Sequence, residues 1–151
     1  EMLDCLVGSE MCIRDSSDYD LLLGLFEIME TEKLDYTNTF RELSKIITSS
    51  DNFKLSEKLS IWLTSYKDRL SKDENSIEES KILMDENNPK YILRNYLAQS
   101  AIEDAEQGKA EKIDELAKVL SNPYVDLGKS MEKYCEPAPK EQRNQKLSCS
   151  S

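Results

Sequence analysis

The side chains that could do chemistry are few in this 151-residue chain, and their types exclude whole classes of site. There is no histidine, which excludes triads with a histidine base and histidine-ligated metal sites within these residues. The cysteines are Cys5, Cys12, Cys135 and Cys149, and none forms a Cys-x-x-Cys pair or a zinc-binding spacing. Scattered cysteines in a long acidic chain are typical of free thiols in a reducing compartment.

Two short segments resemble cation sites but lack the residues that such sites need. Residues 126–128 (Asp-Leu-Gly) match the metal-binding triplet of protein kinases, yet the four glycines do not cluster into a phosphate-covering loop. An ordinary turn after a helix is the better interpretation. The acidic segment from Asp73 fails the EF-hand pattern, because Ile77 and Glu78 occupy positions that need an oxygen ligand and a glycine. We expect no catalytic residue, no cofactor-binding residue and no metal ligand here.

The charge balance limits the partners. Lys and Arg total 20 against 30 Asp and Glu, so the formal net charge is -10. Such a chain repels nucleic acid phosphates and anionic lipid, and no run of about 18 apolar residues exists. We therefore expect neither a nucleic acid nor a membrane as partner. Apolar residues make up only 38%, which fits a helical piece that rests on another part of a protein.

Polar and aromatic side chains concentrate in residues 88–99, NPKYILRNYLAQ. Asn88 is a strong N-cap type and Pro89 suits the first helical position, so the pattern predicts a helix that begins at Asn88. That start places Arg94 and Asn95 in the middle of a helix. Their polar face is either solvated or a docking surface on which Arg94 pairs with a carboxylate of a neighbouring domain. We favour the docking surface, because the chain is poor in core residues.

The elements that position these side chains are predicted to be helical. Apolar residues recur with a helical period, and cap signals stand at Asp35, Ser76 and Gly108, whereas no alternating strand pattern appears. The sequence therefore predicts an all-α fold of five or six short helices plus an extended C-terminal tail. The helices are expected in residues 18–32, 35–47, 56–70, 76–84, 88–108 and 110–120. Four aromatic residues at helical spacing are expected in the core rather than at a nucleotide: Trp62, Tyr66, Tyr91 and Tyr96.

The chain divides into three predicted parts. Residues 1–16 include CLVGSEMCIRDS, which lacks helical period and cap signals and resembles a translated sequencing adapter. We expect this part to be non-native or disordered. Residues 17–128 form the helical region. Residues 129–151 are rich in proline and polar residues and are expected to be an extended tail that ends in SCSS.

Four segments in the order YTNTFRELS, NPKYILRNYLAQSAIEDAEQG, LSNPYVD and LSCSS resemble the C-terminal region of the selenoprotein O family. The resemblance runs from about Asp18 to Ser151. It implies a full-length parent with an α+β protein-kinase-like fold that transfers AMP from ATP to protein hydroxyl side chains with magnesium or manganese. In that family the ATP-binding and metal-binding residues lie in a core that precedes this region. The expected partners are thus the chain's own missing kinase-like core and the protein substrates of the parent.

The resemblance carries one functional position onto this chain. The family's redox-active C-terminal cysteine or selenocysteine matches Cys149, and its expected partner lies in the missing core. Cys135 matches no family position. The family implies a bacterial cytoplasm or a mitochondrion as the location. A second interpretation from a different class stays open, in which the chain is a stand-alone helical protein-interaction module without catalysis.

Overall fold

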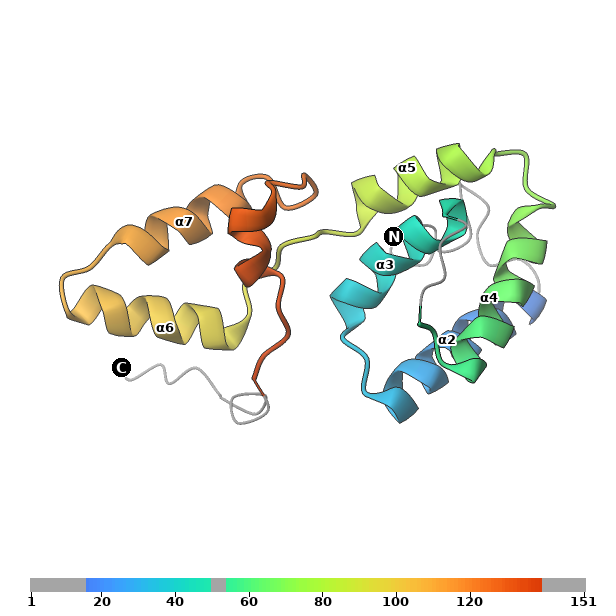
Figure 1. The fold of residues 1–151 in the computed structure, drawn as a ribbon, viewed down its shortest axis with the longest axis horizontal. Helices are drawn as coiled ribbons and strands as arrows, with labels where there is room; N and C mark the ends of the chain where they lie inside the picture. Colours follow the sequence, from blue (N-terminus) through green and yellow to red (C-terminus); the bar gives the residue numbers. More distant parts are fainter. Residues whose placement is uncertain (1–15, 50–53, 140–151) are drawn as a thin grey trace. The chain divides into compact units, whose positions relative to one another are not determined.

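The computed structural model describes residues 16–49 and 54–139, and every regular element in these ranges is helical (Figure 1). The predicted all-α fold is confirmed for this part of the chain, which contains six α-helices and one short 3-10 helix. They are α2 (Ser16–Glu32), α3 (Tyr36–Thr48), α4 (Glu57–Leu70), α5 (Ile77–Asn87), α6 (Asn95–Glu106), α7 (Glu111–Leu120) and η1 (Lys129–Tyr134). Among these helices none is both long and apolar enough to cross a bilayer.

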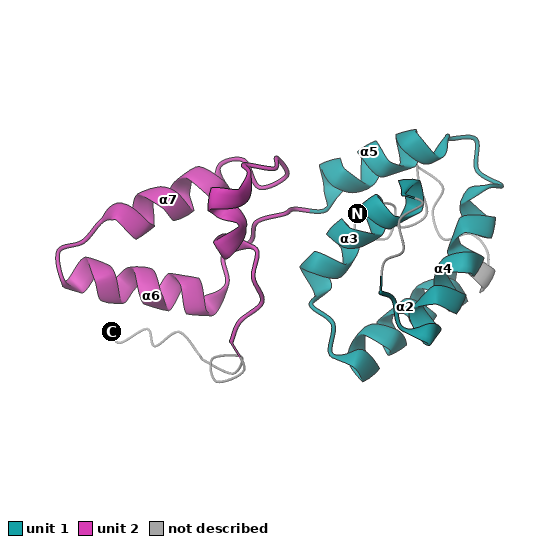
Figure 2. Cartoon of the chain, viewed as in Figure 1, with its two compact units in different colours: residues 1–88 teal, residues 89–151 magenta. Residues whose placement is uncertain are grey.

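The chain splits into two compact units, residues 1–88 and residues 89–151 (Figure 2). In unit 1, α2 packs against α4 and α3 packs against α5. Its core combines aliphatic residues of all four helices with Phe40, Trp62 and Tyr66. The indole Nε1 of Trp62 donates a hydrogen bond of 2.7 Å to the backbone carbonyl of Leu21, which fixes α4 to α2. Trp62 and Tyr66 are thus packing residues, as their spacing predicts.

The helix starts in unit 1 follow the predicted cap signals. The carboxylate of Asp35 accepts the Asn38 N–H at 3.0 Å ahead of α3. Ahead of α5, the Ser76 hydroxyl accepts the Glu79 N–H while the Glu79 carboxylate accepts the Ser76 N–H. This reciprocal capping box satisfies two backbone donors that a helix start otherwise leaves unpaired.

Unit 2 is built from α6, α7 and η1 around a small core. Its buried residues are Tyr91, Leu97, Ala101, Leu116, Val119 and Tyr134. Tyr91 lies ahead of α6, and its hydroxyl accepts the backbone N–H of Leu127 at 3.1 Å. The ring of Tyr96 packs partly buried against the same core. The predicted core position is confirmed for Tyr91, whereas Tyr96 lies at the edge of the core.

The predicted helix start at Asn88 is wrong. Asn88 ends α5 as its C-cap, with its N–H bonded to the Met84 carbonyl, and α6 begins only at Asn95. The residues between the helices are not helical, and the N–H groups of Lys90 and Tyr91 both donate to the carbonyl of Pro123, at 2.7 and 3.1 Å. This contact joins segments more than thirty residues apart, so local sequence does not reveal it.

The segment after α7 is ordered further than its composition indicates. Residues 129–134, at the start of the predicted tail, form η1, because the Tyr134 side chain is buried in the core of unit 2. The Tyr96 hydroxyl then donates to the Glu136 carbonyl at 2.9 Å, which holds the next residues against unit 2. The remaining part of the predicted tail, residues 140–151, lies outside the described residues.

Candidate functional site

The two residues predicted to dock a neighbouring domain lie at the start of α6. Arg94 is the N-cap residue of α6 and Asn95 is its first helical residue. The prediction that both residues lie in the middle of a helix is therefore wrong. The guanidinium of Arg94 is half-buried and its Nη2 donates to the Cys135 carbonyl at 3.4 Å. The Asn95 side chain is exposed. Arg94 therefore has a role inside unit 2.

The cysteines fall in different parts of the chain. Cys135 is half-buried just after η1, and burial raises the pKa of its thiol. A raised pKa lowers the fraction of thiolate at neutral pH, and the thiolate is the reactive form. Cys135 is therefore a packing residue of low reactivity. Cys149, the predicted redox cysteine, lies outside the described residues, as do Cys5 and Cys12.

The kinase-like triplet at residues 126–128 lies between α7 and η1. The Asp126 carboxylate accepts the Gly128 N–H at 2.9 Å, and Gly128 adopts φ 84°, which glycine tolerates without strain. The same carboxylate pairs with the Lys90 ammonium at 2.6 Å. Burial lowers the pKa of Lys90, but the hydrogen bond to Asp126 and the charge interactions with Tyr91, Asp126 and Cys135 together outweigh it, and the net shift is upward. Asp126 thus accepts a local backbone hydrogen bond and pairs with Lys90, and its interpretation as part of an ordinary turn stays a prediction.

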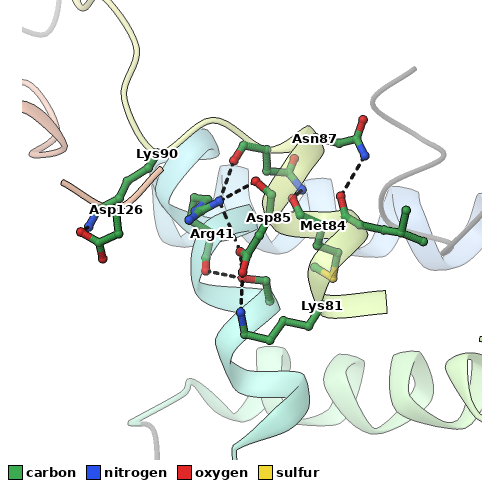
Figure 3. A network of polar contacts seen from close by, with 10 residues as sticks. Arg41, Lys81, Met84, Asp85, Asn87, Lys90 and Asp126 are labelled. Carbon is green, nitrogen blue, oxygen red and sulfur yellow. Dashed lines mark hydrogen bonds and ion pairs between the residues drawn. The ribbon is translucent and has the colours of Figure 1, made fainter. Parts of the chain in front are cut away.

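A polar network in unit 1 ties α3 to the C-terminal end of α5 (Figure 3). Arg41 Nη1 donates to the carbonyls of Asp85 and Asn88, at 2.8 and 3.1 Å, and lies 3.3 Å from the Asp85 carboxylate. Ser44 donates to the same carboxylate at 2.6 Å, and Lys81 pairs with it from the preceding turn of α5. Arg41 thus satisfies carbonyls that a helix end leaves unpaired and places a positive charge there.

This network is not apparent from the sequence, because its members are far apart in the chain. Arg41 and Asp85 are 44 residues apart, and each alone reads as a solvated charge on a helix face. The one local signal is the spacing of Lys81 and Asp85, which places the two side chains on adjacent turns of one helix. The network joins α3 to α5, so its contacts stabilise the fold of unit 1.

Unit 2 carries a small hollow of about 240 Å³ beside α6, α7 and η1. Its two lysines are already paired. Lys112 contacts the Asp104 carboxylate at 2.7 Å, and Lys133 contacts the Glu115 carboxylate at 2.6 Å. A phosphate group would compete with both carboxylates for these ammonium groups. The hollow is therefore poorly suited to bind the phosphates of a nucleotide.

The described residues do not fit ATP and a divalent metal. No group of three or more Asp, Glu, Cys or His side chains in residues 16–49 and 54–139 is placed to hold a metal ion. The aromatic rings of Trp62, Tyr66 and Tyr91 are buried and cannot stack on a base. No chemical step can be assigned to side chains in this part of the chain.

Comparison with known proteins connects the chain to a family of enzymes. The sequence profile of the family described as "Protein adenylyltransferase SelO" matches residues 3–121. The match begins inside the segment set aside as non-native, and the boundary at residue 16 stays a prediction. A relative from Yersinia pseudotuberculosis, named "Protein nucleotidyltransferase YdiU", is 40% identical over 119 residues. Relatives of the same name from Pectobacterium atrosepticum and Photobacterium profundum are 36% and 37% identical over 140 and 153 residues.

These alignments cover much of this chain but a small share of the relatives. They take in 75% of the chain for the Yersinia relative and 89% for the other two. They cover only 25% of the length of the Yersinia relative, 29% of the Pectobacterium relative and 30% of the Photobacterium relative. The chain thus spans between a quarter and three tenths of the length of the curated relatives that it matches.

Proposed function

Because the chain belongs to the SelO family of protein adenylyltransferases, we propose that it is the C-terminal helical part of an enzyme that transfers AMP to proteins. One observation carries the proposal: the family profile matches residues 3–121, which is most of the chain. The relatives that support it are protein nucleotidyltransferases by name, and three quarters of the Yersinia relative lies outside its alignment with this chain. That remainder has room for a complete catalytic core.

The reaction proposed for the parent is a nucleotidyl transfer. The hydroxyl oxygen of a protein side chain attacks the α-phosphorus of ATP and loses its proton. The bond from the α-phosphorus to the bridging oxygen breaks, and pyrophosphate leaves with that electron pair. Magnesium or manganese neutralises charge on the phosphates in such reactions. All groups that bind ATP and metal are proposed to lie in the kinase-like core and not in this chain.

The proposed role of the helical part is to support that core. Units 1 and 2 each have their own hydrophobic core, which suits them to present fixed surfaces to the rest of the polypeptide. We keep Arg94 and Asn95 as proposed contacts with the core. The Asn95 side chain is exposed and the Arg94 side chain is half-buried, so both have surface that the core could contact.

A redox role is proposed for Cys149 in the full-length parent. The support is its position third from the end in LSCSS, which matches the family's C-terminal redox cysteine. The partner of Cys149 is proposed to be a cysteine of the core.

Calorimetry on the 151-residue chain tests where the chemistry lies. ATP with Mg²⁺ is titrated into the chain, and we expect no saturable heat, because the described residues offer neither a phosphate cradle nor a metal site. Micromolar binding would contradict the proposal that the nucleotide site lies outside this chain. If the chain is instead a stand-alone interaction module, its segment will fail to replace the corresponding segment of an active relative.

That replacement defines a second reagent, called here the swap enzyme. It is the Yersinia pseudotuberculosis relative in which the segment aligned with this chain is exchanged for the corresponding residues of this chain. It contains the three quarters of the relative that lie outside the alignment together with the aligned part of this chain. AMP transfer by this protein reports whether the helical part works within an enzyme of the family.

A further inference from the structure

Unit 1 has an apolar groove between α2 and α4 that the described residues leave open. Its volume is about 390 Å³. Gly24, Ile28, Ile61 and Trp62 line it together with the polar residues Glu27, Thr31 and Lys58. Ile61 is 64% exposed, which is high for a large aliphatic side chain on a helix that also buries Leu59, Trp62 and Leu63. Each Å² of apolar surface removed from water contributes about 25 cal/mol, so covering this groove would stabilise a complex.

Gly24 keeps the groove open. A Cβ atom at this position would stand 3.6 Å from Cδ1 of Trp62, which is ordinary van der Waals contact, so packing does not require glycine. The backbone of Gly24 is helical and does not need a positive φ. Glycine inside a helix costs about 1 kcal/mol relative to alanine. The sequence therefore has a helix-destabilising residue at a point where longer side chains would fill the groove.

We propose that this groove binds apolar side chains from elsewhere in the same polypeptide, namely from the part that lies outside these 151 residues. The proposal rests on the proposed function, since it takes the chain to be part of a longer enzyme. The chain spans at most three tenths of the relatives compared above, so most of the parent polypeptide is available to cover the groove. A second copy is a poorer occupant, because each copy carries a formal net charge of -10 and like charges repel.

Thiol labelling at two matched positions tests the proposal. Ile61→Cys places a thiol in the groove, and Ile82→Cys places one on α5, outside the groove, where the isoleucine is 55% exposed. Each substitution is made in the 151-residue chain and in the swap enzyme, and peptide mapping follows the labelling rate at that position alone. We expect labelling at position 61 to be at least about tenfold slower in the swap enzyme than in the chain. The rate at position 82 should agree between the two proteins.

Three results would overturn the assignment. Equal labelling at position 61 in both proteins would show that the groove stays open in the enzyme. Equal protection at positions 61 and 82 would show that the covered surface is not this groove. Labelling at position 61 could also be slow in the 151-residue chain without the rest of the enzyme. If that rate falls as the concentration of the chain is raised, the occupant is a second copy.

A filling substitution separates docking from folding. Gly24→Met extends a flexible apolar side chain into the groove, and methionine favours a helix more than glycine does. We expect the thermal midpoint of the 151-residue chain to stay level or rise and that of the swap enzyme to fall. A swap enzyme whose midpoint rises with that of the chain would contradict the proposed docking. AMP transfer by the unsubstituted swap enzyme tests the proposed function separately, because protection at position 61 is measured without activity.

Discussion

The guanidinium of Arg69 holds the carboxylate of Asp18 at two points, with Nε 2.6 Å from Oδ1 and Nη2 3.2 Å from Oδ2. Its remaining nitrogen pairs with Asp73, one turn further along the chain. Hydrogen bonds to Asp18 and Asp73 raise the pKa of Arg69 above its usual value, so its charge is permanent. The pair joins the first turn of α2 to the last turn of α4 and closes one end of unit 1.

Arg69→Met is expected to destabilise unit 1 strongly. The side chains of Asp18 and Asp73 are only 7% and 8% exposed, and the substitution leaves both carboxylates without their cation. Breaking such a pair costs about 3 kcal/mol of the free energy of unfolding. Urea unfolding followed by circular dichroism measures this loss. The control is Lys72→Met, which breaks the ion pair between Lys72 and Asp68, whose side chains are 65% and 68% exposed. This substitution should lower the free energy of unfolding by less than about 0.5 kcal/mol. Equal losses for the two variants would contradict the role given to Arg69.

The Asp85 network predicts a loss of stability in acid. Burial raises the pKa of Asp85, but hydrogen bonds from Lys81 and Ser44 and the charge of Arg41 outweigh it, so the pKa in the folded chain is lowered. A lowered folded pKa gives stability that is present above the unfolded value, about 3.9, and is lost as pH falls through the folded value.

Unfolding of the wild type and of Asp85→Asn at a series of pH values checks this sign. The difference in free energy of unfolding should be constant above about pH 5 and should shrink below about pH 4. Lys81→Met removes a hydrogen bond that lowers the pKa and should make the change with pH smaller. A difference that stays constant down to about pH 2.5 would refute the assignment of the acid loss to Asp85.

The capping box at the start of α5 is expected to be worth about 1 kcal/mol, the usual cost of removing a serine cap. Ser76→Ala removes the hydroxyl that accepts the Glu79 N–H at 3.2 Å. Chemical denaturation measures the resulting shift in midpoint. Ser60→Ala serves as the matched control, because Ser60 is exposed within α4 and alanine favours a helix interior. A loss for Ser60→Ala as large as that for Ser76→Ala would rule out a capping effect.

Cys149 is expected to form a disulfide in the full-length parent under oxidising conditions. Peptide mapping of the oxidised parent without reduction should find Cys149 joined to a cysteine of the core. Cys135 should stay free in the same sample, because burial raises the pKa of its thiol and lowers its reactivity. If Cys149 is always recovered as a free thiol, the redox role is wrong.

Much of the fold could be predicted because its determinants are local. Asp35, Ser76 and Gly108 mark helix ends where the pattern placed them, and Gly108 adopts φ 77° as a residue after a helix often does. The helical spacing of Trp62 and Tyr66 also predicted their burial. In each of these cases the residues that determine the structure lie within a few positions of one another in the sequence.

The failures come from interactions between distant residues. Asn88 has the side chain of an N-cap, and its β-region backbone suits an N-cap as well as the C-cap that is observed. The contact of Lys90 and Tyr91 with Pro123 then holds the next residues outside a helix. The network of Arg41 and Asp85, and the burial of Tyr134, likewise depend on partners far along the chain.

The rate of AMP transfer by the swap enzyme tests the central claim most directly. Radiolabelled ATP and Mg²⁺ are supplied with a protein substrate of the Yersinia relative, and label on the substrate is compared for the relative, the swap enzyme and a swap enzyme carrying Leu25→Asp. Leu25 is fully buried in unit 1, so that substitution should unfold the helical part. The account predicts transfer by the swap enzyme within about tenfold of the relative, and a large loss with Leu25→Asp. A folded swap enzyme that transfers no AMP would contradict the account.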